Sequence, residues 1–474
     1  MKPEETVGFL EQLRSVVGAT NVLTDEGDLA PYVVDARKRY RGGALCVVRP
    51  ASTQEVSSVL ALCHGVGIAV VPQGGNTGMC GGATPYADRP SIVLALSRMN
   101  RVREVDALNS TISVDAGCTL ASVQSEAAAV GRLFPMSLGS EGSCQIGGNI
   151  ATNAGGTAVL RYGPMRDLVL GIEAVLPDGR IVNAMKSLRK DNTGYALKHL
   201  FIGSEGTLGV ITGAVLKLFA KPQSDAVVMV GLEDIDAALN LLQHVQARAG
   251  DRLTNFEVMC RNEYDLVMRL PKGLQDPLAE RHPWMAIVEL THLNADADLD
   301  DELATIIHEA MESGLVKEAV LATSEAQAEL IWEIRHSVTE ANVNAGLTFS
   351  HDTSVPVSRV PDFVRGVERL VAERFPQAMP VFVGHVGDGN IHAVVVLPRE
   401  GEHTKDVNAT AAAVNAVIDE VALSLDGSIS AEHGIGRSNR ARLKAYLDPA
   451  DHELMQGIKA LFDPKGLMNP GVLL

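Results

Sequence analysis

The 474-residue sequence lacks several patterns that assign chains to common protein classes. It has no run of about 18 uncharged apolar residues and no signal-peptide core, so we predict neither a transmembrane segment nor export. Its six cysteines show no C-x-x-C pair and no zinc-finger spacing, and we interpret them as small buried residues in a reducing compartment. The predicted location is therefore the cytoplasm.

Positive charge is also in short supply. The chain has 41 basic and 58 acidic residues, a net charge of -17, which argues against binding to nucleic acid or to an anionic membrane surface. Aromatic residues make up only 4% of the chain, but 46% of it is hydrophobic. This length and composition are typical of a soluble enzyme with two or three domains and an ample core.

The two common nucleotide-binding fingerprints are absent as well. There is no G-x-G-x-x-G after a strand and no G-x-x-x-x-G-K-[ST], which excludes a standard Rossmann or P-loop site. Instead, three other glycine-rich runs stand at 72–82, 135–156 and 203–212, among short apolar strands and helices such as 53–65. Glycines with small hydroxyl and amide residues suit a pyrophosphate, because backbone N–H groups can approach it closely. Tight turns are the alternative for one run, but three together favour a large dinucleotide-like cofactor.

The glycine content and the hydrophobic pattern of the sequence change after residue 220. Glycine becomes sparse, and strands such as 226–232 and 284–290 alternate with long amphipathic helices at 234–249, 298–313 and 325–345. We therefore expect an α+β protein with a cofactor domain at 1–220 and an antiparallel sheet backed by helices at 221–425. The segment 426–474 is expected to pack back on the first domain.

A β-hairpin is predicted around residues 380–397, with Asp388-Gly389 as a two-residue type I′ turn. In that register His385 faces His392, and directly opposed residues have Cβ atoms about 5 Å apart. The pair could hold a metal ion, or it could be two polar residues on a solvated strand face. A third ligand is offered by Glu432, and the adjacent His433 suits a proton acceptor.

With these pieces in place, the chain resembles the FAD-linked D-2-hydroxyacid dehydrogenases (D-lactate, glycolate and D-2-hydroxyglutarate types) of the vanillyl-alcohol oxidase and p-cresol methylhydroxylase superfamily. The motifs are P-Q-G-G-N-T-G at 72–78, G-G-N-I-A-T-N-A-G-G at 147–156, G-S-E-G-T-L-G at 203–209, G-H-V-G-D-G-N-I-H at 384–392, E-H-G-I-G at 432–436 and N-P-G at 469–471. The resemblance covers nearly the whole chain. It implies a two-subdomain FAD-binding domain of the p-cresol methylhydroxylase type with an antiparallel-sheet cap domain.

The resemblance also implies which residues bind FAD. They are Pro72, Gly74, Gly75, Asn76, Thr77, Gly78, Leu138, Gly139, Ser140, Gly147, Gly148, Thr152, Asn153, Gly155, Gly156, Glu205, Gly206, Gly209, Ile211 and Asn469. The segment 205–211 would lie along the adenosine side and Asn469 near the ring end. Many relatives bind the flavin covalently through a His where this chain has Asn76, so we expect non-covalent FAD.

By the same resemblance His385, His392 and Glu432 bind a divalent metal, which we expect to be zinc, although iron or manganese would accept these ligands. The expected reaction is oxidation of a D-2-hydroxy acid to the 2-oxo acid. The metal would polarise the 2-hydroxyl, His433 would take its proton as general base, and the C2 hydride would pass to flavin N5.

The resemblance implies that Arg335, Thr339 and His351 bind the substrate, with Arg335 on a carboxylate. Arg335 and Thr339 are expected one turn apart on one face of a helix. A surface ion pair with Glu329 or Glu333 is the alternative. Relatives that oxidise dicarboxylates often have a Lys and an Asn where this chain has Ser350 and Val394. This favours a D-lactate-like acid, with D-2-hydroxyglutarate as the alternative, because His351 could supply part of the lost charge.

Three further alternatives stay open on the sequence. The chain could be an oxidase that uses oxygen, a non-catalytic flavin subunit of an electron-transfer assembly, or a zinc-stabilised domain without flavin. The last would leave the glycine runs unexplained. We expect a separate electron acceptor, such as a quinone, a cytochrome or an electron-transfer flavoprotein, and a homodimer as the family-level expectation.

Overall fold

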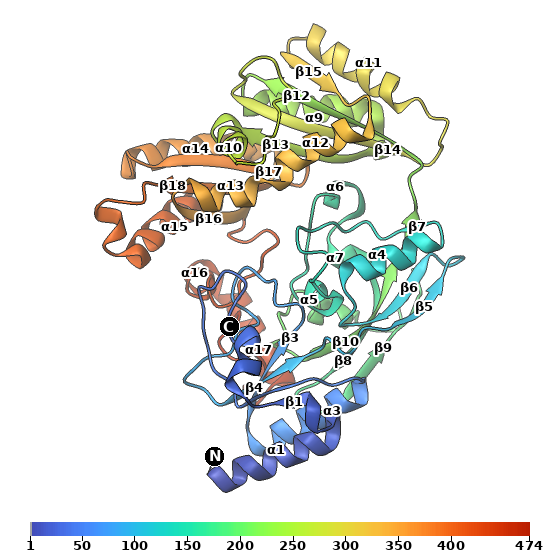
Figure 1. The fold of residues 1–474 in the computed structure, drawn as a ribbon, viewed down its shortest axis with the longest axis vertical. Helices are drawn as coiled ribbons and strands as arrows, with labels where there is room; N and C mark the ends of the chain where they lie inside the picture. Colours follow the sequence, from blue (N-terminus) through green and yellow to red (C-terminus); the bar gives the residue numbers. More distant parts are fainter. Residues whose placement is uncertain (1) are drawn as a thin grey trace. The chain divides into compact units, whose positions relative to one another are not determined.

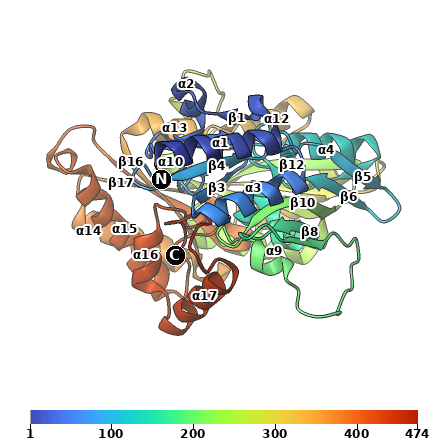
Figure 2. The same ribbon diagram turned by 90° about the horizontal axis from the view of Figure 1, so that it is seen from below.

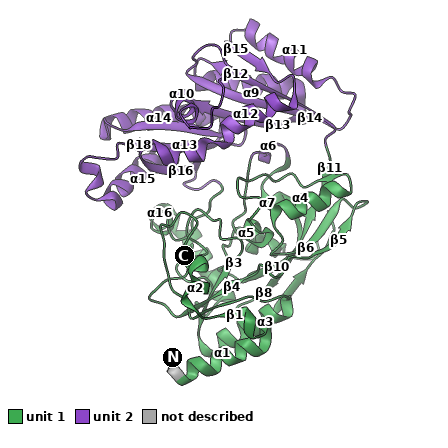
Figure 3. Cartoon of the chain, in the orientation of Figure 1, with its two compact units in different colours: residues 1–156, 162–221, 432–474 green, residues 157–161, 222–431 purple. Residues whose placement is uncertain are grey.

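A computed structural model describes residues 2–474 and divides the chain into two compact units. Unit 1 comprises residues 1–156, 162–221 and 432–474, and unit 2 comprises 157–161 and 222–431 (Figure 3). The short segment 157–161 and the stretch 426–431 thus cluster with unit 2 rather than with the first domain and tail expected from the sequence. None of the helices within residues 2–474 is long and apolar enough to cross a membrane.

Unit 1 begins with a four-stranded sheet in the order β1-β2-β4-β3. Its strands are β1 (Val22–Leu23), β2 (Cys46–Val48), β3 (Ala69–Gln73) and β4 (Ser91–Ala95), of which β2, β4 and β3 run parallel. Helices α1 (Pro3–Val17) and α3 (Thr53–Val66) lie along these strands (Figure 2) and share one hydrophobic core with them. The predicted strand–helix–strand unit is therefore confirmed.

Local sequence explains where α3 begins and ends. The Ser52 side chain accepts a hydrogen bond from the Glu55 N–H, which satisfies one donor of the first turn. Val56, Val59, Leu60 and Cys63 form the buried face. The helix stops at Gly67, whose left-handed conformation ends the turn without steric cost. The defined end of α3 sets where β3 begins, at Ala69. The 74–78 loop follows directly from the end of β3, at the edge of the sheet.

A second, antiparallel sheet completes unit 1 in the order β5-β6-β10-β8-β9. Its strands are β5 (Val102–Asp106), β6 (Thr111–Asp115), β8 (Val169–Val175), β9 (Ile181–Ala184) and β10 (Val210–Lys217), and β7 (Arg132–Leu133) pairs with β11 (Phe219–Ala220) nearby. The helices of this part are α2 (Glu26–Leu29), α4 (Leu120–Ala129), α5 (Ile146–Ala151), α7 (Met165–Leu168) and α8 (Lys198–Phe201). Buried side chains of both sheets belong to one core.

The C-terminal segment of unit 1 contains α16 (Arg440–Tyr446) and α17 (Pro449–Phe462). Beyond them Met468 forms a bridge with Val70 of β3, and its side chain is buried in the core of unit 1. The Lys459 ammonium binds the Asp463 carboxylate at 2.6 Å, and that carboxylate accepts the N–H groups of Leu467 and Met468. These bonds hold the chain end against the first sheet.

Unit 2 is built on one antiparallel sheet in the order β15-β12-β14-β13-β17-β18-β16 (Figure 1). The strands are β12 (Ser224–Leu232), β13 (Leu253–Cys260), β14 (Trp284–His292), β15 (Glu318–Leu321), β16 (Leu347–Ser354), β17 (Met379–His385) and β18 (Asn390–Leu397). One layer of helices contains α9 (Ile235–Ala249), α11 (Leu299–Glu312), α14 (Val360–Arg374) and α15 (Val407–Ser424). The other contains α10 (Arg261–Met268), α12 (Glu325–His336) and α13 (Val338–Ala345). The predicted antiparallel sheet backed by helices is confirmed.

One predicted helix of unit 2 is divided. The amphipathic stretch 325–345 breaks at Ser337 into α12 and α13. Backbone bonding nevertheless continues, because the Ser337 N–H donates to the Glu333 carbonyl and the Ala341 N–H donates to the Ser337 carbonyl. The Ser337 side chain is buried and bonds the Lys272 ammonium at 3.1 Å. The break is therefore a kink anchored by a polar contact, a pattern common at Ser in helices.

Candidate functional site

The hairpin that carries the two histidines is present, but its turn differs from the prediction. Residues Val386–Asp388 form a 3-10 turn, and only Gly389 has a positive φ, of 82°, whereas a type I′ turn needs two such residues. His385 therefore pairs with Asn390, and His392 pairs with Val383. The predicted register was wrong by two residues, because Val386 is buried in the core and leaves the ladder.

A shift of two residues keeps every side chain on the same face of a sheet. His385 and His392 thus become diagonal rather than direct neighbours, and their ring centroids lie 5.7 Å apart with the rings nearly perpendicular, at 83°. His385 is 7% exposed. Asp352 pairs directly with His392 from β16, and its carboxylate lies 3.7 Å from the ring nitrogen Nδ1. Two imidazoles and a carboxylate therefore share one face of the sheet.

Sequence reasoning missed a fourth polar residue on this face. Glu257 of β13 lies opposite His385 in the register that pairs Val258 with Gly384. Its carboxylate accepts a hydrogen bond from His385 Nδ1 and, at 2.7 Å, from Arg335 Nε. Burial raises the pKa of Glu257, but the charges of His385 and Arg335 outweigh burial and lower that pKa to about 2. The signal available in the sequence was a lone carboxylate in the stretch 253–260, which has no other charged residue.

Arg335 is held where it could bind an anion. Helix α12 begins after Ser324, whose hydroxyl accepts from the Gln327 N–H, and it buries Ile331 and Ile334. The Arg335 side chain is only 13% exposed, and Glu257 is its one hydrogen-bond or ion-pair partner within the described residues. Its two terminal nitrogens are thus available for a carboxylate. Thr339, expected one turn further along the same helix, lies beyond the kink and is exposed.

His351 lies on the opposite face of the sheet. It pairs with Ala393 in β18, and its Nε2 is 2.8 Å from Asn415 Oδ1 on α15. This placement argues against the predicted role of His351 in binding substrate beside His385 and His392. Ser350 and Val394, in contrast, pair directly with each other. They lie on the face that carries His392, because residues two apart on a strand share a face.

In unit 1 the first two glycine-rich runs lie against each other. A Cβ on Gly75 would be 1.9 Å from the Ser143 carbonyl oxygen, and a Cβ on Gly156 would be 2.3 Å from that of Ser137. Gly75 thus allows the first run to approach the second, and Gly156 allows the two ends of the second run to approach each other. Beside them, Gly78, Gly139 and Gly148 have no atom within 4 Å of an added Cβ.

The backbone of the first loop is suited to a phosphate. Within the described residues, none of the N–H groups of 74–78 donates a hydrogen bond. Consecutive unbonded amides beside open glycines form the kind of concavity that binds a pyrophosphate. The loops therefore fit FAD by their own geometry.

Four of the predicted cofactor residues have a strained backbone conformation. Asn76, Asn153, Glu205 and Asn469 all adopt positive φ, between 42° and 54°. Such conformations cost energy and often persist at ligand sites. The Asn76 side chain donates to the carbonyl oxygens of Pro31 and Val34, so it holds a neighbouring loop.

Other predicted cofactor residues make contacts within the protein. Thr152 Oγ1 donates to the Gly148 carbonyl, and Asn153 Oδ1 accepts from the Arg166 N–H. The third glycine run lies beside the first and beside β8: an added Cβ on Gly206 would be 3.1 Å from Pro72, and one on Gly209 would be 2.6 Å from the Val175 carbonyl. Ile211 is buried in β10. The structure thus brings the three runs together in unit 1.

Glu205 connects the third glycine run to the E-H-G-I-G motif. Its carboxylate accepts the N–H groups of Ile435 at 2.9 Å and Gly436 at 2.8 Å. Burial raises the pKa of Glu205, against the effect of these two hydrogen bonds. Asn469, which is also buried, donates to the carbonyl oxygens of Glu205 and Gly82. Both side chains therefore hold loops together, and their placement on the adenosine side and near the ring end stays a prediction.

Glu432 and His433 open the last segment of unit 1. Glu432 Oε2 accepts the Gly156 N–H at 3.1 Å, and Glu432 Oε1 lies 3.8 Å from His433 Nε2. The preceding residue, Ala431, donates its N–H to the Asp352 carbonyl within unit 2. Within unit 1, the Glu432 carboxylate is therefore bonded to the second glycine-rich run.

Comparison with known proteins identifies the family. The C-terminal domain of FAD-linked oxidases matches residues 221–473, and an FAD-binding domain matches residues 44–185. The chain belongs to the FAD-linked oxidase family. FAD binding and an oxidoreductase activity follow from this membership, and the resemblance inferred from the sequence motifs is confirmed.

This FAD-linked oxidase has curated relatives of nearly its own length. It is 39% identical to the mitochondrial D-2-hydroxyglutarate dehydrogenase of Bos taurus, over 95% of this chain and 80% of that protein. It is 35% identical to a D-2-hydroxyglutarate dehydrogenase of Xanthomonas citri pv. viticola, over 97% of this chain and 96% of that protein. Its fold is similar to that of p-cresol methylhydroxylase, with a TM-score of 0.76 over 99% and 97% of the two chains at 15% identity. The predicted fold class is confirmed.

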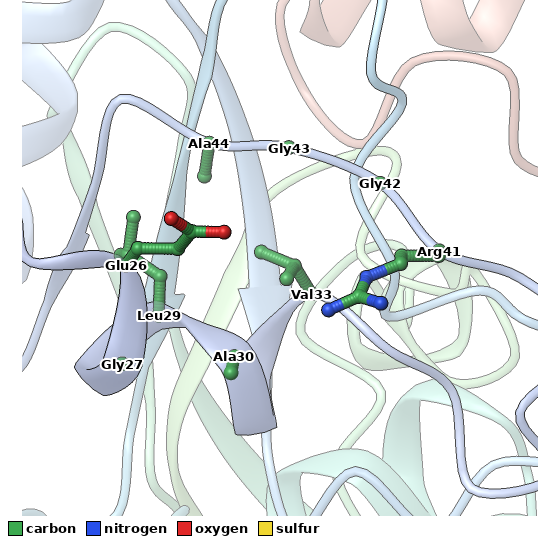
Figure 4. A pocket seen from close by; sticks show the side chains of 9 residues that line it. All are labelled: Glu26, Gly27, Leu29, Ala30, Val33, Arg41, Gly42, Gly43 and Ala44. Carbon is green, nitrogen blue, oxygen red and sulfur yellow. The ribbon is translucent and has the colours of Figure 1, made fainter.

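The FAD-linked oxidase also has a surface hollow of about 530 Å³ in unit 1 (Figure 4). Leu29, Val33 and Ala44 form its apolar side, and Glu26 and Arg41 stand at its rim. None of the predicted cofactor residues lines it. This hollow is therefore not the cofactor site predicted from the sequence.

Proposed function

We propose that this FAD-linked oxidase is a dehydrogenase of D-2-hydroxy acids, with D-2-hydroxyglutarate as the first substrate to test. The observation that carries the proposal is the polar face of the unit 2 sheet. There Glu257 bonds both Arg335 and His385, and the His392 ring lies 5.7 Å from that of His385. The Arg335 side chain is only 13% exposed, and its terminal nitrogens are unbonded within the described residues. A guanidinium beside metal-ligand side chains suits a substrate with a carboxylate next to an oxidisable hydroxyl.

The choice of substrate rests on the relatives. Those named above are D-2-hydroxyglutarate dehydrogenases, which supports a dicarboxylic acid ahead of the D-lactate-like acid that the sequence favoured. Ser350 and Val394 supply no cation or amide on the face that carries His392. D-lactate therefore remains the second candidate in the test.

The residues fit the groups that the proposal needs. His385, His392 and Glu432 would hold a divalent metal, because two imidazoles and one carboxylate are a common ligand set of catalytic zinc sites and are also acceptable to iron or manganese. The loops at 74–78 and 138–156 would hold FAD without a covalent bond. FAD, when bound, accepts the hydride from C2, and the metal, when bound, acts as a Lewis acid on the substrate oxygens.

The chain's own residues have the following roles in the proposal. Arg335 binds the substrate carboxylate through its two terminal nitrogens and so orients C2. His433 accepts the proton of the 2-hydroxyl, since imidazole exchanges protons near neutral pH. Glu432 lies beside His433, with its other oxygen on the Gly156 N–H. The hydrogen bonds of Glu205 to Ile435 and Gly436 keep this segment in place.

Anaerobic stopped-flow absorbance tests the proposal. FAD-loaded protein is mixed with D- and L-2-hydroxyglutarate, D- and L-lactate and other 2-hydroxy acids, before and after chelation. We expect flavin bleaching by D-acids only, fastest with D-2-hydroxyglutarate, lost with chelator and restored by Zn²⁺. A bound flavin that no 2-hydroxy acid reduces would contradict the proposal and favour a non-catalytic flavin subunit.

We also propose that the electrons pass to a separate acceptor rather than to oxygen. Quinones, cytochromes and an electron-transfer flavoprotein are the candidates, and reoxidation of the substrate-reduced flavin by each distinguishes them. Rapid reoxidation by air alone would instead favour an oxidase. The cytoplasmic location and the homodimer stay predictions from the sequence.

A further inference from the structure

Glu257 has a role that the proposed function does not assign. We propose that Glu257 is a positioning residue that fixes the substrate-binding Arg335 and the metal ligand His385 with one carboxylate. The inference rests on the proposed function, because it uses the metal and the substrate carboxylate defined there. It assigns to Glu257 both the orientation of a metal ligand and the placement of the guanidinium.

The first step concerns His385. Glu257 Oε1 is bonded to His385 Nδ1, and the two residues lie opposite each other on neighbouring strands. With Nδ1 donating to a carboxylate, Nε2 is the ring nitrogen that can bind an ion. A ligand imidazole is usually held in this way, and loss of such a partner commonly weakens metal binding about 10- to 100-fold.

The second step concerns Arg335. The other oxygen, Glu257 Oε2, accepts from Arg335 Nε at 2.7 Å. A guanidinium held through Nε leaves the edge formed by its two terminal nitrogens open, which suits bidentate binding of a second carboxylate. Glu257 is the only hydrogen-bond partner of Arg335 in the part of the chain that the structure describes. Glu257 therefore sets the direction in which the Arg335 guanidinium faces the substrate.

The third step joins the two. Glu257 is 2% exposed and sits on a strand, so its carboxylate has little freedom to follow either partner. One rigid carboxylate that bonds both residues fixes the distance between the Arg335 guanidinium and the metal ligand His385. That distance decides which acids can bind with C2 in the reacting position. Glu257 also adds negative charge between Arg335 and the imidazole, which offsets the repulsion that a bound cation would feel from the guanidinium.

Zinc affinity tests the inference directly. The full-length FAD-loaded protein is titrated with Zn²⁺ against a chromophoric chelator, for wild type, E257Q, R335K and the exposed control E373Q on α14. A Gln side chain has no charge and only one acceptor oxygen, so E257Q weakens the bonds to both partners. We expect E257Q to weaken zinc binding about 10- to 100-fold, whereas R335K and E373Q stay within about twofold of wild type.

Steady-state kinetics supply the second readout. At saturating zinc, R335K is expected to raise KM for the substrate strongly, and E257Q to raise it as well. E257D keeps the charge but has a side chain shorter by one carbon, so it cannot reach both partners. We expect E257D to show the wild-type zinc affinity or the wild-type KM, but not both. It also keeps the inference testable if E257Q fails to load FAD or to fold.

The outcomes separate this inference from the proposed function. Wild-type zinc affinity in E257Q, or an E257D variant equal to wild type in both readouts, overturns the role of Glu257 alone. A wild-type protein that binds no zinc or other divalent ion overturns the metal site and this inference with it. Weaker zinc binding in E257Q with an unchanged KM overturns the part that concerns Arg335.

Discussion

Buried carboxylates connect separate parts of the chain in both units. In unit 1, Glu205 accepts two N–H groups of the 434–436 turn, and Asp463 accepts two N–H groups of the segment that returns to β3. In unit 2, Glu257 bonds residues of β17 and α12. A carboxylate has several acceptor sites, so one side chain can hold two backbone or side-chain donors. Removing any of them leaves buried donors unbonded, at a cost of about 1–3 kcal/mol each.

At the residue scale, replacement of His433 tests the general base. The change H433Q keeps a polar side chain next to Glu432 but removes the proton acceptor. We expect flavin reduction by the best D-acid to slow by about 10²- to 10⁴-fold, with FAD and zinc contents unchanged. H452Q on α17 is the matched control, since it changes a His of the same unit outside the site. A rate within threefold of wild type would remove His433 from the mechanism.

Glu263 gives a prediction for pH and stability. This residue of α10 is fully buried, and it accepts from Asn342 Nδ2 at 3.2 Å. Glu263 Oε1 and Asn342 Oδ1 have no partner within the described residues. A protonated Glu263 would satisfy both, as a carboxylic acid paired with an amide. Burial raises the pKa of Glu263 to about 7, against the effects of Asn342 and Arg335.

The sign follows from linkage. A carboxyl whose pKa is raised by folding binds its proton more tightly in the folded state, so stability falls as pH rises from the unfolded value of 4.5 toward about 7. The variant E263Q cannot ionise, so its stability does not fall in this way, and its amide can still donate a hydrogen bond to Asn342. We expect E263Q to match wild type in thermal unfolding at pH 5 and to exceed it at pH 8, by up to about 3 kcal/mol. Equal stability of E263Q and wild type at both pH values would show that ionisation of Glu263 does not destabilise the folded protein.

At the scale of elements, the hairpin turn decides how the histidines meet. A two-residue turn would have placed His385 and His392 directly opposite each other. The observed turn, with Val386 in the core and Gly389 left-handed, leaves them diagonal on the same face. The even shift preserved the functional pairing of the two side chains, although the predicted turn was wrong. The kink at Ser337 has a comparable effect, because it separates Thr339 from the helix that positions Arg335.

The substitution G389A tests the geometry of the turn, because it adds only one methyl group. Gly389 has φ of 82°, and an added Cβ would lie 2.1 Å from the Val355 carbonyl oxygen. We expect G389A to lose about 1–2 kcal/mol from the backbone conformation alone, with the clash adding to that, in urea unfolding. Zinc content should fall too, since the turn joins the strands that carry both histidines.

G65A provides the control for that variant. Gly65 lies inside α3, and an added Cβ there meets no atom within 4 Å. Gly in a helix interior is less stable than Ala by about 0.5–1 kcal/mol, so G65A should be neutral or slightly stabilising. Equal losses in the two variants would contradict the turn geometry.

At the scale of the whole molecule, each unit has its own hydrophobic core. The predicted metal ligands His385 and His392 lie in unit 2, and Glu432 lies in unit 1. All the predicted FAD-binding residues lie in unit 1. Because binding stabilises only the structure that binds, FAD should act on the unfolding of unit 1.

Differential scanning calorimetry checks this expectation. We expect two transitions for the FAD-free protein, one for each unit. FAD at about 100 times its Kd should stabilise the unit 1 transition by about 2.7 kcal/mol and leave the other unmoved. Chelator added to the FAD-free protein serves as the control for metal. An equal FAD shift of both transitions would show that unit 2 also contributes to FAD binding.

The sequence by itself determined the class of the protein. Glycine spacing predicted the three loops that the structure brings together, and alternation of apolar residues predicted the strands and the helices of both units. These features depend on neighbours in the chain, and so they can be read locally. Asp-Gly between apolar strands predicted the hairpin, and the motifs predicted the family, the fold and FAD.

Only the tertiary structure decided which side chains meet. Glu257 is 128 residues from His385 and meets it through the pairing of β13 with β17. His351 and Ser350 are adjacent in the sequence but lie on opposite faces of one strand, so only one of them shares a face with His392. The turn register depended on the burial of Val386 in a core assembled from distant segments. Local patterns fix elements, whereas strand order, register and helix placement bring distant groups together, and these depend on packing across the whole unit.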